Sequence, residues 1–201
     1  MSDEEPRDPS SLSLAVRDAL VDRLLADLAA PGRTAAVDAA LRDLAALDGD
    51  GGDVAAPPDL PVLADDPAQR RRAREVLLGY RAALERVPRG VDVVTRLAQA
   101  RVLFAAALYF EVHEVLEPAW REATGDARRI LQGIIQAAVA WHHGARGRGA
   151  PALRKAEAAS AKLTDAPDAW NGFPIAALRA LLDEYRRAVE RGALPTAPPG
   201  F

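Results

Sequence analysis

Apolar residues recur every three to four positions along most of the chain, which is the period of an α-helix. The first such stretch runs from Leu12 to Leu28 and stops at a Pro-Gly pair. A second stretch follows Thr34, a residue type that favours the position before a helix, and it continues to about Leu47. Two short helices joined by a tight turn form an αα-hairpin, so we predict an N-terminal helical hairpin over residues 11–47.

A segment without helical periodicity follows this hairpin. Residues 48–66 contain three glycines, three prolines and several aspartates, which is typical of a linker or a long loop. Helical periodicity resumes at Pro67, where Asp66 can cap the new helix. The further helices are predicted over residues 67–87, 92–107, 151–163 and 175–191, with two more between residues 108 and 143.

These patterns predict an all-α protein, because no segment shows the alternation of apolar and polar residues that marks a strand. We expect an antiparallel helical bundle of roughly seven helices, in which the N-terminal hairpin is an extension of a core formed by residues 67–191. Residues 1–10 are polar and predict a disordered tail, and the proline-rich residues 192–201 predict a second tail.

Composition excludes several classes of function. The absence of cysteine excludes a disulfide framework, thiolate catalysis and zinc sites built from cysteine. A formal net charge of −3 supplies no global positive field that would recruit nucleic acid. No apolar run approaches the ~18 residues of a membrane span, and the acidic N-terminus lacks the apolar region of a secretory signal. We therefore predict a cytoplasmic protein without a membrane or nucleic-acid partner, while a protein partner or a homo-oligomer is compatible with the sequence.

One stretch, residues 108–143, is rich in polar residues that carry little or no formal charge. It holds all three histidines and two of the three tryptophans. The pattern predicts a hairpin of two helices in this stretch. On the first helix, His113 and Glu117 are i,i+4 neighbours, and on the second Gln132, Gln136 and His143 share one stripe. If the two stripes face each other, they form a polar pocket. We predict that its residues are His113, Glu114, Glu117, Trp120, Gln132, Gln136 and His143.

Three kinds of chemistry suit such a pocket. A divalent metal ion is one, since His113 and Glu117 present two ligands on one helix face and His143 offers a third. A small-molecule or acid–base site that uses the carboxylates and imidazoles is another. The third is a structural network in which buried amides and imidazoles satisfy one another. The sequence names no reaction, and it leaves open whether the protein is an enzyme.

Two motifs in this stretch resemble a known family. The first motif, HExxExxW, runs from His113 to Trp120, and the second, QGxIQ, runs from Gln132 to Gln136, followed by His143. This order is similar to that of the DUF309 family, and the resemblance covers about residues 97–163. It implies a compact all-helical fold with no established biochemical activity. The chain departs from the family pattern after the second motif, where Arg148 stands in place of the usual asparagine.

Two functional hypotheses follow from the pocket and the resemblance. In the first, a DUF309-like domain holds a polar His/Glu/Gln pocket between two helices and binds a metal ion or a small molecule. In the second, the protein is a non-enzymatic helical interaction module, and the polar cluster only holds the hairpin together.

Overall fold

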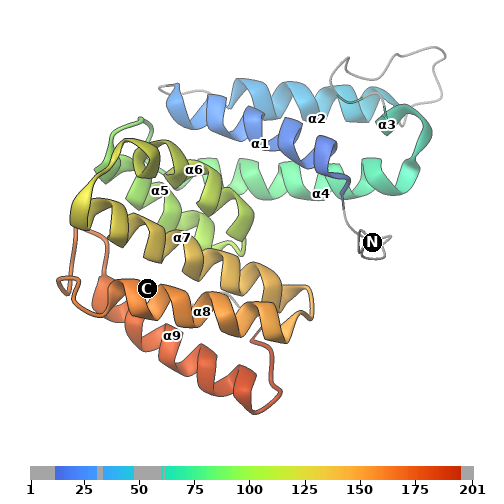
Figure 1. Cartoon of the computed structure of the whole chain (residues 1–201). Coiled ribbons are helices and arrows are strands. Elements are labelled where there is room, and N and C mark those ends of the chain that lie inside the picture. The colour runs from blue at the N-terminus through green and yellow to red at the C-terminus, as the bar shows by residue number, and fades with distance from the viewer. Residues whose placement is uncertain (1–11, 31–33, 48–59, 61, 196–201) are drawn as a thin grey trace. The chain divides into compact units, whose positions relative to one another are not determined.

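A computed structural model describes residues 12–30, 34–47, 60 and 62–195, and these residues form an all-helical structure (Figure 1). The described residues contain eight helices of thirteen or more residues and one of four residues. The all-α prediction is therefore confirmed, with one long helix more than the expected seven. The predicted tail 1–10 and most of the predicted loop 48–66 lie outside the described residues.

The chain divides into two compact units, residues 1–89 and residues 90–201. Within the described residues, no helix is both long and apolar enough to cross a lipid bilayer. The first unit contains α1 (Leu14–Ala29), α2 (Ala35–Leu47), α3 (Val62–Asp65) and α4 (Pro67–Leu84). The second unit contains α5 (Val93–Ala105), α6 (Tyr109–Glu122), α7 (Gly125–Ala145), α8 (Gly149–Leu163) and α9 (Ile175–Glu190).

In the first unit, α4 packs against both α1 and α2, and the three helices bury their apolar stripes together. From the sequence, residues 67–87 are predicted to belong to the core formed with the following helices. The spacing of apolar residues shows that a helix has an apolar face, but it does not show which neighbouring helix packs against that face. Whether residues 67–191 fold as one domain stays a prediction.

A buried aspartate fixes α2 to α1. The carboxylate of Asp27 accepts hydrogen bonds from the backbone N–H groups of Ala36 at 3.0 Å and Val37 at 2.9 Å. These N–H groups belong to the first turn of α2 and have no partner inside the helix. The hydroxyl of Thr34, the predicted cap, donates to the side chain of Asp38 instead. A residue from the preceding helix therefore takes the capping role.

In the second unit, each helix from α5 to α9 packs against the next one along the chain. The aromatic centre of this unit is Phe104, whose ring centroid lies 5.4 Å from those of Tyr109 and Trp141. The ring of Tyr185 on α9 lies 4.2 Å from Trp141, and its hydroxyl donates to the Ala140 carbonyl at 2.9 Å. Trp141 thus points into the core, on the side of α7 away from its polar stripe.

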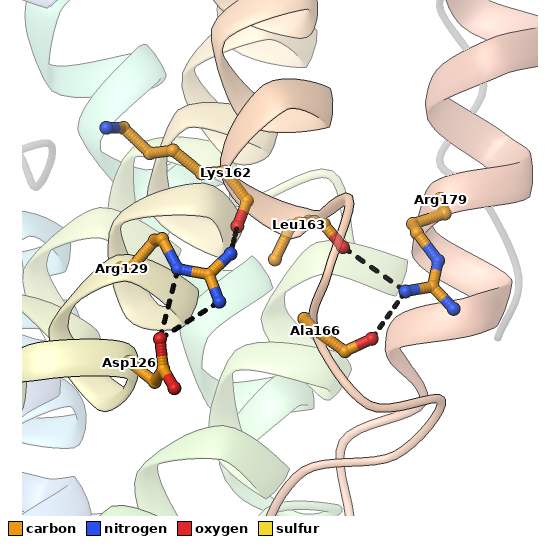
Figure 2. Close-up of polar contacts among 6 residues, drawn as sticks. All are labelled: Asp126, Arg129, Lys162, Leu163, Ala166 and Arg179. Atoms are coloured by element: carbon orange, nitrogen blue, oxygen red, sulfur yellow. Dashed lines mark hydrogen bonds and ion pairs between the residues drawn. The ribbon is translucent and has the colours of Figure 1, made fainter.

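Two arginine side chains donate hydrogen bonds to carbonyl groups at the C-terminal end of α8, as Figure 2 shows. Arg129 of α7 donates to the Lys162 carbonyl at 2.7 Å. Arg179 of α9 donates to the carbonyls of Leu163 at 3.2 Å and Ala166 at 2.6 Å. The last carbonyls of a helix have no N–H partners within it, so these bonds hold α7, α8 and α9 together at one end.

Candidate functional site

Helix α6 carries the first predicted motif. It runs as a single helix from Tyr109 to Glu122, although Pro118 lies inside it. Val112, Val115 and Leu116 are buried on one side. The polar residues between them are placed at the margin of the buried face, because successive helical positions are about 100° apart.

Three side chains on α6 form a compact cluster. Potential ligand atoms of His113, Glu114 and Glu117 all lie within 4.8 Å of one another, and the three side chains are half-buried. Nδ1 of His113 is hydrogen-bonded to Oε1 of Glu114 at 2.7 Å. Glu117 accepts a hydrogen bond from Arg121 at 2.9 Å. Within the residues that the structure describes, this is the one group of three or more His, Cys, Asp or Glu residues with such spacing.

The electrostatics of the cluster centre on His113. The hydrogen bond from its ring to Glu114 raises the pKa of His113, and the negative charges of Glu114 and Glu117 raise it further, against the opposing effect of burial. Because Glu114 occupies Nδ1, Nε2 is the ring nitrogen that can bind another group. The carboxylate therefore both orients the imidazole and increases its basicity.

Two contacts fix the register of α7 against α6. The guanidinium of Arg128 lies over the ring of Trp120, 4.2 Å from its centroid, and the rings of Phe110 and His142 lie 6.2 Å apart. The two helices are therefore antiparallel, as the predicted hairpin requires. Between these contacts, the middle of α7 lies level with the cluster on α6.

Gln132 and Gln136 occupy this middle part of α7, and both are half-buried. The side-chain oxygen of Gln136 is buried and has no hydrogen-bond partner among the residues that the structure describes. Buried polar atoms are nearly always paired, so an unpaired amide oxygen at the level of the cluster is a place for a water molecule or a ligand.

His143 lies farther along the same stripe of α7 and does not belong to the cluster. Its Nδ1 atom is buried, with no hydrogen-bond partner in the described part of the chain. Burial lowers the pKa of His143, and the nearby charges of Arg148 and Lys155 lower it further. The structure therefore groups His113 with Glu114 and Glu117, whereas the sequence grouped His113 and Glu117 with His143.

Trp120 and Gly133 have surroundings that the sequence did not indicate. Trp120 is half-buried beneath Arg128, which also donates to the Trp120 carbonyl at 2.9 Å. Trp120 lies at the end of the α6–α7 hairpin, about one helical turn beyond Glu117. A Cβ atom at Gly133 would lie 2.7 Å from the Leu163 side chain of α8. The glycine serves the packing of α7 against α8.

A separate cavity of about 560 Å³ lies beside the C-terminal end of α6. Its lining includes Arg96, Pro118, Leu131 and Trp170, and none of the predicted pocket residues. Trp170 is held by a tight turn in which Asn171 and Gly172 both have positive φ, at 48° and 77°. An Asn-Gly pair is the sequence signal for such a turn.

The geometry defines a helical domain with a half-buried His/Glu cluster on its surface. Residues 97–154 match the model of the family DUF309, described as a domain of unknown function. This segment contains α6, α7 and every predicted pocket residue, and its match to the DUF309 model confirms the resemblance predicted from the sequence. No curated protein and no solved structure matches the chain.

Proposed function

We propose that the second unit binds a divalent metal ion through His113, Glu114 and Glu117. The observation that carries the proposal is the convergence of one imidazole and two carboxylates within 4.8 Å. Half-burial supports it, because partial exclusion of water strengthens the attraction between carboxylates and a cation.

The donor set favours particular metals. One nitrogen and two or more oxygens suit zinc, manganese and iron(II), at metal–donor distances of about 2.0–2.2 Å. Donor atoms around such an ion lie roughly 3–4 Å apart, so the cluster needs only small side-chain rotations. Glu114 has two arrangements open to it: direct coordination, or retention of its hydrogen bond to Nδ1 while Nε2 of His113 binds the ion.

Protein donors from one helix do not fill a coordination sphere. The remaining positions suit water or a small molecule, which is the arrangement of metal sites that bind or activate ligands. The unpaired amide oxygen of Gln136 supports a contribution from α7, since amide oxygens are ligands for hard cations. We infer that Gln136 binds the ion either directly or through a water molecule.

A thermal melt of the full chain tests this function. The protein is first melted with EDTA and then with added zinc, manganese or iron(II). A metal that binds only the folded state raises Tm by mass action, by about 5 °C at a hundredfold excess over Kd. Glu117→Gln should abolish this rise, whereas Glu122→Gln, an exposed carboxylate on the same helix, should retain it. No rise with any metal, or equal rises in both variants, would reject the proposal.

A structural role for the cluster is the second candidate. It is favoured by the hydrogen bonds of His113 with Glu114 and of Arg121 with Glu117, through which the side chains partly satisfy one another. In that case Glu117→Gln lowers Tm equally with and without metal, because Arg121 loses its charged partner.

A further inference from the structure

The cavity beside the C-terminal end of α6 is built entirely from residues of the second unit. Its volume of about 560 Å³ lies within the range of about 300–1,000 Å³ that is usual for small-molecule sites. One arginine, two carboxylates and one tryptophan line it, together with apolar residues and one asparagine. The cavity shares no residue with the His/Glu cluster of α6, so binding there does not depend on the proposed metal site.

The positive charge in the lining belongs to Arg96, and two hydrogen bonds fix its guanidinium. Nε donates to the Val91 carbonyl and Nη1 donates to the Val115 carbonyl, each at 2.7 Å. These bonds leave Nη2 without a partner among the described residues. A fixed guanidinium with unused N–H donors is suited to bind a carboxylate, because the two groups are planar and oppositely charged.

The two carboxylates in the lining differ in their availability. Asp92 caps α5, where its side chain accepts hydrogen bonds from the backbone N–H of Thr95 at 3.0 Å and from the Thr95 hydroxyl. Glu122, the last residue of α6, is exposed and forms no hydrogen bond or ion pair with another described residue. It therefore does not pair with Arg96, although both side chains line the same cavity. The lining thus holds one unused negative group and one unused set of N–H donors.

The aromatic part of the lining is Trp170, in the segment between α8 and α9. Its backbone N–H donates to the Phe173 carbonyl at 3.0 Å, and the Phe173 N–H donates to the Trp170 carbonyl at 2.9 Å. Phe173 is fully buried, so it anchors this turn in the core. The half-buried indole of Trp170 has no ring contact or cation–π contact with another described residue. A fixed aromatic ring of this kind provides a surface for the apolar part of a ligand.

We propose that this cavity binds a free α-amino acid with a large apolar side chain. The ligand carboxylate binds Nη2 of Arg96, its ammonium group binds the carboxylate of Glu122, and its side chain packs against Trp170. A simple anion fits less well, because the lining carries two negative charges and one positive charge. A simple cation would leave the donors of Arg96 unused. A zwitterion matches both unused groups at once.

Calorimetric titration of the full chain with L-phenylalanine tests the proposal, with EDTA present so that no metal ion contributes. Two analogues each lack one charged group: phenylpropionate lacks the ammonium group, and phenethylamine lacks the carboxylate. Phenethylamine should bind at least about tenfold more weakly, because the contact with Arg96 is lost. Phenylpropionate should bind at least about fivefold more weakly, because it meets Glu122 without a compensating positive charge. Equal binding of either analogue and L-phenylalanine would overturn the proposal.

Substitutions then locate the bound amino acid. Arg96→Gln should weaken the binding of L-phenylalanine at least about tenfold. Glu122→Gln should weaken it about fivefold and should reduce the preference over phenylpropionate to less than about twofold, since the partner of the ammonium group is lost. The matched control is Glu157→Gln, which removes an exposed carboxylate of α8 outside the cavity and should change Kd by less than about twofold.

The possible outcomes are distinct. Saturable binding that is weakened in the two cavity variants and retained in Glu157→Gln supports the proposal. Absence of saturable binding for both L-phenylalanine and L-leucine overturns it, and so does equal weakening in Glu122→Gln and Glu157→Gln. Arg96 also links the start of α5 to α6, so Arg96→Gln could unfold the unit. In that case Glu122→Gln decides the question, because the Glu122 side chain bonds to no other described residue.

Discussion

Replacing Gly144 with alanine tests how closely α7 packs against α9. A Cβ atom at this position would overlap the hydroxyl oxygen of Tyr185 and would lie 3.2 Å from the ring carbon that bears it. Tyr185 has little room to move, because its hydroxyl donates to the Ala140 carbonyl and its ring packs against Trp141. The substitution should therefore disturb a rigid part of the core.

The expected cost combines three effects. Overpacking of a core costs about 1–3 kcal/mol, and loss of the tyrosine hydrogen bond costs about 1 kcal/mol. Alanine is better than glycine inside a helix by about 1 kcal/mol, which offsets part of this cost. We expect Gly144→Ala to lower the free energy of unfolding by about 1–3 kcal/mol. In a Tyr185→Phe background the overlapping oxygen is absent, and the same change should cost less than about 1 kcal/mol.

Urea unfolding followed by tryptophan fluorescence measures these differences. All three tryptophans, Trp120, Trp141 and Trp170, lie in the second unit, so the signal reports on that unit. The four proteins of the double-mutant cycle give the coupling between positions 144 and 185. A neutral effect of Gly144→Ala in the presence of Tyr185, or the same cost in both backgrounds, would refute the close packing described here.

Three further predictions concern other parts of the chain. Arg179→Gln should lower the stability of the second unit by about 1–2 kcal/mol in urea, because the end of α8 loses charged donors; an unchanged midpoint would show that water replaces them. Asp27→Asn should lower the Tm seen by circular dichroism, since one of two backbone N–H groups of α2 loses its carboxylate acceptor, at about 1 kcal/mol; an equal Tm would contradict the capping role. His143 has a pKa lowered by burial, so its neutral form stabilises the fold above about pH 6.5, and this stability is lost as the pH falls through the folded-state pKa. His143→Gln should therefore flatten the decline of stability between about pH 7.5 and 5.5, and an equally steep decline would count against it.

The sequence predicted those features that depend on local periodicity. The i,i+4 spacing of His113 and Glu117 places them on one helical face wherever that helix lies, and the structure has both in one cluster. The adjacent residue Glu114 is also a predicted pocket residue, and its carboxylate is hydrogen-bonded to the imidazole of His113. Residue spacing does not determine this contact, because it depends on the rotation of the side chain.

Features that depend on contacts between distant segments were harder to predict. Gly133 lies within the QGxIQ motif, but the motif does not show that this residue lies against α8, where Leu163 occupies the space that a side chain would need. The cavity beside Trp170 combines residues from α5, α6 and α7 with residues from the segments before α5, between α6 and α7, and between α8 and α9. Its residues are apolar or singly charged at scattered positions, so no local pattern marks them as a site.

Equilibrium dialysis against manganese, followed by metal analysis of the protein, tests the central claim most directly. The structure predicts about one ion per chain in the unchanged protein and in His143→Gln, because His143 lies outside the cluster. It predicts little or no bound metal in His113→Gln and Glu117→Gln. Absence of metal from the unchanged protein, retention of metal by both cluster variants, or its loss in His143→Gln would contradict the account.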